Sequence, residues 1–314
     1  MTPPPGLPTE VEAIARTVLY EGYLLYPYAR SAAKNQVRFT FGGVYPPAWT
    51  ADPCRMQSEC LLQAGPGCRL DVTVRCLQLV RRREPDEPDW QEAVERTVVA
   101  ITTTPERLEH RSRRLHVDLA AGRSEEASVQ REWSRIQATV TLCATPLGDD
   151  AHRVTVLIQN TTPAPPGLER DEALLRALVS THIVLHVEGG RLLSLADPPP
   201  ELREAAAACV NQGVWPVPVG EPGSQSTVLC SPIILEDYPQ LAPESPGDLF
   251  DGTEVDELLT LSILSLTDEE KAEMRRSDER GRELLERTEA LTADQMLRLH
   301  AAMRPMGAIR EPPQ

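Results

Sequence analysis

Aromatic residues are scarce in this chain of 314 residues, which has six Tyr, three Phe and four Trp. Long apolar runs are missing too, since no stretch approaches the ~20 residues that a membrane-spanning helix needs. The formal net charge of −15 would repel phosphates and anionic lipid headgroups. We therefore expect a soluble protein without membrane insertion and without a nucleic-acid partner.

Signature motifs of common enzyme classes are also missing. The sequence has no GxxxxGK[ST] phosphate loop, no GxSxG nucleophile elbow and no HExxH metal motif. Its only GxG, Gly65-Pro66-Gly67, lacks the rest of the dinucleotide fingerprint. The sequence thus gives no specific argument for an enzyme, and we expect no cofactor and no catalytic residue.

Seven cysteines, an odd number in a chain of this size, do not indicate a disulfide scaffold. The N-terminus, MTPPPGLPTEVEA, lacks the basic and apolar regions of a secretory signal, so we expect a cytoplasmic protein. Cys54, Cys60, Cys68 and Cys76 invite comparison with a metal site, but zinc sites take cysteines in pairs two to four residues apart. We expect no metal site there, and place Cys60 and Cys76 in the core.

His182 and His186 form a second candidate metal pair. The apolar residues between them favour a strand, on which the two histidines share a face but stand about 13 Å apart. One metal ion cannot bridge that separation. We therefore expect both side chains on the polar, solvent-facing side of the strand.

Alternation of polar and apolar residues dominates the middle of the chain and predicts strands. In LDVTVRCLQLV, for example, Leu70, Val72, Val74 and Cys76 point to one side. The same pattern predicts strands at 114–122, 135–144, 153–159 and 181–195, with a hairpin in TPLGDDAH and a turn at Glu188-Gly189-Gly190. One polar face on each strand favours antiparallel sheets packed in a sandwich-like body.

Helices are expected in fewer places. Thr9 can cap a helix that begins in TEVEAIARTVLYEGYLL, and two further short helices are predicted at 89–96 and 198–210. Residues 251–289 contain thirteen Asp or Glu against six Lys or Arg, with capping patterns that indicate an acidic helical segment. The predicted fold class is α+β.

These patterns divide the chain into four parts. Residues 1–16 are a proline-rich tail and the start of the N-terminal helix, and residues 17–250 are the β-rich body, with a candidate subdomain break near 163–170. Residues 251–306 are the helical C-terminal segment, and residues 307–314 are a tail.

Eight of the thirteen aromatic residues gather between residues 20 and 49, interleaved with basic residues. Tyr and Arg are enriched where proteins bind proteins, although a chain with few aromatics must also use some of them in its core. We place Phe39 and Phe41 on a strand, with both side chains in the core of the protein. The candidates for a partner-binding surface are Tyr23, Tyr26, Tyr28, Arg30, Lys34 and Asn35.

Several long phrases carry a family resemblance: YEGYLLYPYARSAAKNQVRFTFGGVYP, GVWPVPVG, SPIILEDYPQLAPESPGDLFDGTEVDELLTL and LTDEEKAEMRRSDERGRELLERTEAL. Over residues 17 to about 304 the chain resembles an uncharacterised protein family whose members are encoded beside actinobacterial-type, high-affinity [NiFe]-hydrogenases and their maturation genes. The resemblance brings no catalytic or ligand residues with it. It implies a protein that works with a hydrogenase.

Two functions remain open at this point. The first is a non-catalytic accessory or assembly protein that binds a hydrogenase subunit or maturation protein. The alternative is an enzyme or small-molecule-binding protein of the same operon, with a pocket between the body and the C-terminal helices and with Arg38, Glu236 and Asp237 as polar groups.

Overall fold

A computed structural model describes residues 9–21, 40–85, 89–126, 128–148 and 150–239, together with nine single positions between 267 and 289. The chain divides into two compact units, Met1–Tyr23 with Phe39–Gln240, and Leu24–Arg38 with Leu241–Gln314. The continuous described ranges all belong to the first unit, which we call the body. Most of the predicted acidic helical segment, 251–306, lies outside the described residues.

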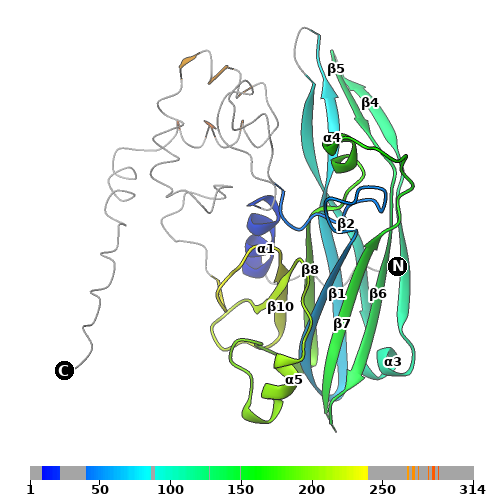
Figure 1. Ribbon diagram of the computed structural model, residues 1–314. Helices are drawn as coiled ribbons and strands as arrows, with labels where there is room; N and C mark the ends of the chain where they lie inside the picture. The colour runs from blue at the N-terminus through cyan, green and yellow to red at the C-terminus, as the bar shows by residue number, and fades with distance from the viewer. Residues whose placement is uncertain are drawn as a thin grey trace, which may run out of the picture. The chain divides into compact units, whose positions relative to one another are not determined.

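The body is built mainly from strands, with a few short helices (Figure 1). The helices are α1 (Thr9–Glu21), α3 (Pro105–His110), α4 (Arg170–Leu174), α5 (Arg203–Ala207) and the 3-10 helix η1 (Pro200–Leu202). The strands are β1 (Arg55–Arg83), β2 (Trp90–Thr103), β3 (Arg113–Leu119), β4 (Gly122–Glu126), β5 (Val129–Trp133), β6 (Ile136–Pro146), β7 (Ala151–Asn160), β8 (Val179–Leu193), β9 (Trp215–Pro218) and β10 (Thr227–Ser231).

The strands form one ten-stranded antiparallel sheet in the order β3-β6-β7-β1-β8-β10-β9. The 29-residue strand β1 is shared by both halves of this sheet. Along one edge of β1, residues 55–63 pair with β7 and residues 70–82 pair with β2. Along the other edge, residues 61–77 pair with β8. Strand β5 pairs with the C-terminal end of β1, at residues 81–83, and β4 pairs with β5. The prediction of a β-rich, antiparallel body is confirmed.

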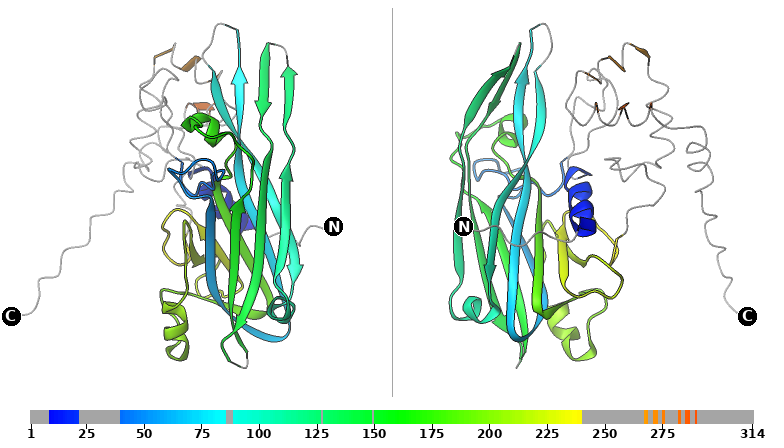
Figure 2. Two further views of the ribbon diagram at one scale, coloured as in Figure 1. Left: turned by 45° about the vertical axis from the view of Figure 1, so that its right-hand side comes forward. Right: turned by 180° about the vertical axis from the view of Figure 1, so that it is seen from behind.

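One apolar core lies between the two halves of the sheet. The predicted inward face of β1, from Leu70 to Cys76, is fully buried there. Side chains from β2, β3, β6, β7, β8 and β10 join the same cluster, so the curved sheet folds around its own core (Figure 2). This shared core explains the clean alternation along β6 and β7, whose inward residues are buried.

Helix α1 covers the outer face of β8, β9 and β10 (Figure 1). Its apolar side chains pack against Val184, Val217 and Leu229, which point away from the main core. Arg75 of β1 adds a paired ionic contact, with Nη1 and Nη2 donating to the Glu12 carboxylate at 2.5 and 2.7 Å. The amphipathic pattern that predicted this helix therefore reflects a real buried face.

The helical prediction for 198–210 is confirmed by η1 and α5, but that for 89–96 is wrong. Residues 90–96 belong to β2, which pairs with β1 in a long ladder that includes Gln78 opposite Val94 and Cys76 opposite Arg96. Glu and Ala favour a helix only weakly, and pairing along an already formed strand overrides that preference.

The predicted turn at 188–190 is also wrong, because β8 continues through it. The irregularity lies in the partner strand instead. Ala64 of β1 pairs with Gly190 and Arg69 with Glu188, so the Gly65-Pro66-Gly67 stretch bulges out of β1. In the part of the chain that the structure describes, no helix is long and apolar enough to cross a bilayer.

Candidate functional site

Exposed large apolar side chains are rare on the body. Across the described residues there are four, namely Phe41, Val210, Trp215 and Ile234. Three of them, Phe41, Trp215 and Ile234, lie on separate segments whose backbones come close to one another beside Pro232. Their exposed fractions are 44%, 42% and 90% respectively.

Pro232 directly follows Ser231, the last residue of β10, and so lies beside the segments that carry Trp215 and Phe41. Ser231 pairs with Trp215 across the β10–β9 ladder, which places the two side chains on one face. On the other side, Gly42 approaches Pro232 so closely that a Cβ on Gly42 would lie 2.7 Å from the proline ring. We call Phe41, Trp215, Pro232 and Ile234 the Pro232 surface.

The segment after Pro232 keeps the alternation of a strand. Ile233 and Leu235 pack against the cluster beneath α1, whereas Ile234 and Glu236 are exposed. Ile234 is therefore held outward because its neighbours are held inward. Its exposure comes from the fold of the segment and not from an unstructured end.

A bulge in β8 positions the other side of the surface. The pairing of β8 with β1 shifts between Arg75 and Leu77, and Ser180 in the shifted stretch has a positive φ of 49°. The backbone N–H of Ser180 donates to the carbonyl of Phe41 at 3.1 Å, and that of Thr181 donates to the carbonyl of Gly42 at 3.0 Å. The Ser180 hydroxyl donates to the carbonyl of Leu19 in α1. One bulge thus anchors both α1 and the Phe41 segment.

His182 ties this bulge to β10. Its Nδ1 lies 2.7 Å from the carbonyl oxygen of Ser180, and its Nε2 lies 3.3 Å from the hydroxyl of Ser231. The same hydroxyl accepts a hydrogen bond from the backbone N–H of Ile233 at 3.1 Å. The imidazole therefore connects the β8 bulge to the end of β10, next to Pro232.

The prediction that His182 faces solvent is wrong, since the side chain is only 1% exposed. Its strand and shared face with His186 are as predicted, but α1 covers that face. Burial lowers the pKa of His182 to about 4, a hydrogen bond to Ser180 opposes that shift, and Arg75 adds to it. A serine beside an oriented imidazole resembles the nucleophile and base of a hydrolase. Ser231 is buried like His182, however, so no substrate can reach the pair, and its hydrogen bonds instead hold the backbone of β8 and β10 in place.

Gly42 offers a test of this geometry. Its φ of +57° and its close approach to Pro232 both disfavour a side chain. We expect Gly42→Ala to lower the free energy of unfolding by about 2–3 kcal/mol, the sum of backbone strain and displacement of Pro232. Urea unfolding followed by circular dichroism would measure it.

Gly167→Ala is the matched control for this change. Gly167 has a φ of +74°, but nothing lies within 4 Å of the position that its Cβ would take. The control should therefore cost only the backbone strain, about 1–2 kcal/mol. Equal losses of unfolding free energy in the two variants would show that the close approach of Gly42 to Pro232 does not contribute to stability.

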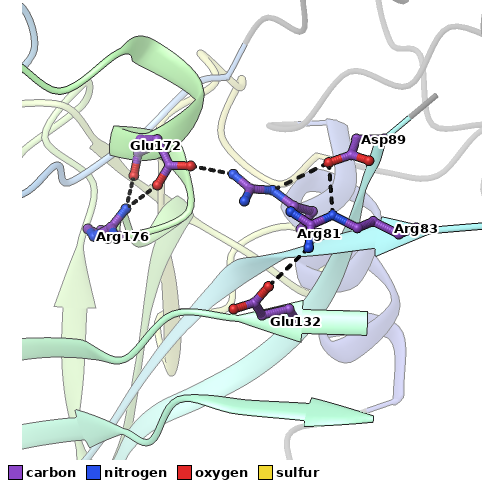
Figure 3. A network of polar contacts seen from close by, with 6 residues as sticks. All are labelled: Arg81, Arg83, Asp89, Glu132, Glu172 and Arg176. Atoms are coloured by element: carbon purple, nitrogen blue, oxygen red, sulfur yellow. Dashed lines mark hydrogen bonds and ion pairs between the residues drawn. The ribbon is translucent and has the colours of Figure 1, made fainter. Parts of the chain in front are cut away.

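The C-terminal end of β1 carries a network of charged side chains (Figure 3). Glu172 of α4 binds both Arg81 and Arg176, and hydrogen bonds from these two guanidinium groups lower its pKa. Asp89 lies 4.0 Å from Arg81 and 3.1 Å from Arg83. Arg83 also reaches Glu132 of β5 at 3.6 Å. The network joins α4, β1 and β5, and each of its charges has an opposite partner.

The residues predicted to bind a partner lie outside the described residues, so the structure places none of them. They are Tyr23, Tyr26, Tyr28, Arg30, Lys34 and Asn35, and Phe39 lies outside as well. Phe41 is described, and the prediction that it belongs to the core is wrong. Its backbone is held by the β8 bulge while its ring is left at the surface.

The polar groups of the alternative hypothesis are only partly described. Arg38 lies outside the described residues, and Glu236 is exposed. The carboxylate of Asp237 accepts a hydrogen bond from the hydroxyl of Ser194, which itself accepts from the backbone N–H of Ala196 at 3.1 Å. Asp237 therefore fixes the chain after β8 to the segment that follows β10.

The cysteines are all free thiols, and Cys60, Cys68, Cys76 and Cys230 are buried. Burial raises the pKa of the Cys76 thiol to about 12, so this group is a poor ligand at neutral pH. In the described ranges, no three side chains of the His, Cys, Asp or Glu type are arranged to hold a metal ion.

The Pro232 surface was missed by sequence reasoning, although two signals were present. In GVWPVPVG, a tryptophan precedes two prolines that can only occupy an edge strand. In SPIILED, alternation places Ile234 opposite to its two apolar neighbours. Compared with known proteins, the chain matches no protein-family model and no curated protein.

Proposed function

We propose that this chain is a cytoplasmic, non-catalytic accessory protein that supports the maturation or assembly of a [NiFe]-hydrogenase through protein–protein contacts. The observation that supports a binding role is the exposure of Phe41, Trp215 and Ile234, three of the four exposed large apolar side chains of the described residues, on segments that adjoin at Pro232. The resemblance to hydrogenase-linked proteins supports the choice of partner.

The chemistry of the Pro232 surface fits a contact with another protein. Exposed apolar groups that gather in one place commonly mark interaction sites, whereas single ones need no explanation. Aromatic side chains such as Trp215 and Phe41 bury large areas with little loss of rotamer freedom, and Trp is among the residues whose truncation most weakens interfaces.

The proposal also retains a sandwich-like body followed by an acidic helical segment at 251–306. The tyrosine-rich candidates between Tyr23 and Asn35 would then provide a further contact for the same partner. Both lie mainly outside the described residues and stay predictions.

Co-purification from a host that expresses the hydrogenase operon tests this function. We expect the tagged chain to retain a hydrogenase subunit or maturation protein, and the double variant Trp215→Ser, Ile234→Ser to retain at least about tenfold less. Quantitative mass spectrometry of the eluates measures the difference.

Val210→Ser is the matched control, because it removes an apolar side chain of similar exposure to Trp215 from outside the Pro232 surface. It should leave the recovered partner unchanged. If no hydrogenase subunit or maturation protein is retained, and deletion of the gene leaves hydrogen uptake intact, the proposed function is wrong.

A further inference from the structure

We propose that two copies of this chain associate through the outer edge of β3, which pairs antiparallel with the same strand of the other copy and forms one sheet across the dimer. This self-association goes beyond the function proposed above, because it requires neither a hydrogenase nor a maturation protein. It rests on the position of β3 in the sheet, on the order of its side chains and on the charge at its N-terminal end.

Strand β3 is the last strand at one end of the sheet, next to β6 (Figure 1). Among the described residues, no strand pairs with its other edge, which we call the β3 edge. The ladder with β6 is regular from Arg113 to Leu119, and these seven residues include no proline. A regular outer strand presents unpaired N–H and C=O groups at alternate residues, so the β3 edge can accept a further strand.

Two of the other outer strands are protected against such pairing. At the opposite end of the sheet, β9 contains Pro216 and Pro218, which have no N–H to donate. Along β2, the ladder with β1 shifts between Val74 and Arg75, and a bulge of this kind disturbs regular pairing along an edge. The β3 edge has neither of these features.

The side chains of β3 alternate between the core and the outer face of the sheet. On the inner side, Val117 is buried and Leu115 packs against the core cluster. The alternating residues on the outer side are all exposed, namely Arg114, His116 and Asp118. Directly opposed residues of an antiparallel pair share a face, so a strand added to this edge has to match both sets of side chains.

A second copy of β3 matches both sets when the two strands pair about His116. On the outer face, Arg114 of each copy then lies opposite Asp118 of the other, and two-fold symmetry makes this contact twice. On the inner face, Leu115 lies opposite Val117, which extends the apolar core across the dimer. The order of side chains in Arg114–Asp118 is therefore complementary to itself in the antiparallel direction.

The charged groups of this register can form the new contacts. Arg114 forms no ion pair with another described residue. Asp118 accepts a hydrogen bond from Nε of Arg135 at 2.7 Å, and its side chain is 48% exposed. Since a carboxylate has about four acceptor positions, Asp118 can bind a second guanidinium without releasing Arg135.

The N-terminal end of β3 favours the antiparallel direction over the parallel one. Residues 107–114 contain four arginines and one glutamate. Parallel strands would place these basic ends side by side, whereas antiparallel strands keep them apart. The net charge of −15 on each copy and the small area of a single strand pair indicate a weak dimer, with a dissociation constant on the order of tens of micromolar.

Sedimentation velocity of the purified full chain tests the dimer and its register. We expect the weight-average mass to rise with concentration from 34.7 kDa toward twice that value. Arg114→Asp and Asp118→Arg should each weaken self-association at least about tenfold, because each places like charges opposite one another twice. An equimolar mixture of the two variants should associate like the wild type, since each supplies the charge that the other lacks. Arg203→Asp, which changes an exposed arginine on α5, should leave the dimer unchanged.

A cysteine at the predicted two-fold axis reports the register directly. In His116→Cys, the two introduced thiols lie opposite each other at a separation that a disulfide can span, so mild oxidation should produce a covalent dimer. Gln159→Cys is the matched control. Gln159 is exposed on the same face but lies two strands further in, opposite Thr139, which itself lies opposite His116. The control and the wild type should give at least about tenfold less covalent dimer.

Three results would overturn the proposal. The first is a wild-type chain that stays at 34.7 kDa up to about 500 µM. The second is a mixture of Arg114→Asp and Asp118→Arg that associates no better than either variant alone. The third is a yield of covalent dimer from His116→Cys that does not exceed the yield from Gln159→Cys. None of these results bears on the hydrogenase partner, and failure to recover that partner leaves the dimer intact.

Discussion

Replacing Glu92 by glutamine is expected to destabilise the body by about 3–5 kcal/mol, which is the usual cost of breaking a buried ion pair. The Glu92 side chain is only 12% exposed and bridges two arginines. Its Oε1 accepts from Nη1 of Arg82 at 2.7 Å, and its Oε2 accepts from Nε of Arg131 at 2.8 Å. The neutral amide would remove the Glu92 charge from both guanidinium groups and leave Glu84 beside Arg82 and Glu126, at 3.9 Å, beside Arg131. In a region with little solvent this loss of charge compensation is costly.

Glu132→Gln makes the same chemical change in β5, on the other side of β1 from β2, and serves as the control. The Glu132 side chain is 64% exposed and reaches Arg83 at 3.6 Å, so the control should cost less than about 1 kcal/mol. Urea denaturation at neutral pH and low salt compares the two variants. Similar losses of unfolding free energy in the two variants would mean that the burial of Glu92 does not increase its contribution to stability.

Acidification should weaken the body through His182, whose pKa falls from an ordinary value of 6.5 to about 4 in the fold. Because the unfolded chain binds the proton first, the stability that the neutral imidazole provides is complete above pH 6.5. It is lost as the pH falls from 6.5 to 4, and it does not change further below that range. The total loss is on the order of 3 kcal/mol.

A variant isolates this effect from the titration of carboxylates. His182→Gln keeps an amide that can bind Ser180 and Ser231 but cannot take up a proton in this range. Its free energy of unfolding should therefore fall less than that of the wild type between pH 6.5 and 4.5. His116→Gln changes an exposed histidine and should keep the full wild-type dependence. Parallel pH profiles for the wild type and His182→Gln would contradict the role of His182.

The strands of the body were predictable where one face meets the core and the other meets water. Along β6, Ile136, Val140 and Leu142 are buried between half-buried polar residues, so period-two alternation was sufficient. The N-terminal helix was predictable for the same reason, because only one of its faces is covered. These patterns are local, and a sequence displays them directly.

Features that depend on distant partners could not be predicted in this way. Residues 90–96 form a strand because β1 pairs with them, and nothing within that stretch of sequence indicates its pairing partner. His182 is buried because α1, more than 160 residues earlier, covers its face. The Arg81, Arg82 and Arg83 run was visible in the sequence, but its acidic partners on β2, β5 and α4 become evident only when the strands are aligned.

The candidate site shows the same division. The sequence drew attention to the aromatic window at 20–49, because composition is a local signal. The Pro232 surface combines residues from positions 41, 215, 232 and 234, and the approach of their segments depends on the β8 bulge and on the β10–β9 ladder. Exposure of Phe41 and Trp215 therefore emerges from the assembled sheet.

The length of β1 has a consequence for how the body can be divided or rebuilt. Both halves of the sheet depend on the backbone of this one strand. Strands β2, β5, β7 and β8 all pair with residues within Arg55–Arg83. A cut or insertion in that strand would take hydrogen-bond partners from both halves at once, so no smaller portion retains a complete core. The loops of such a body can change in length without touching this strand, whereas its two halves cannot be separated without losing part of their shared core.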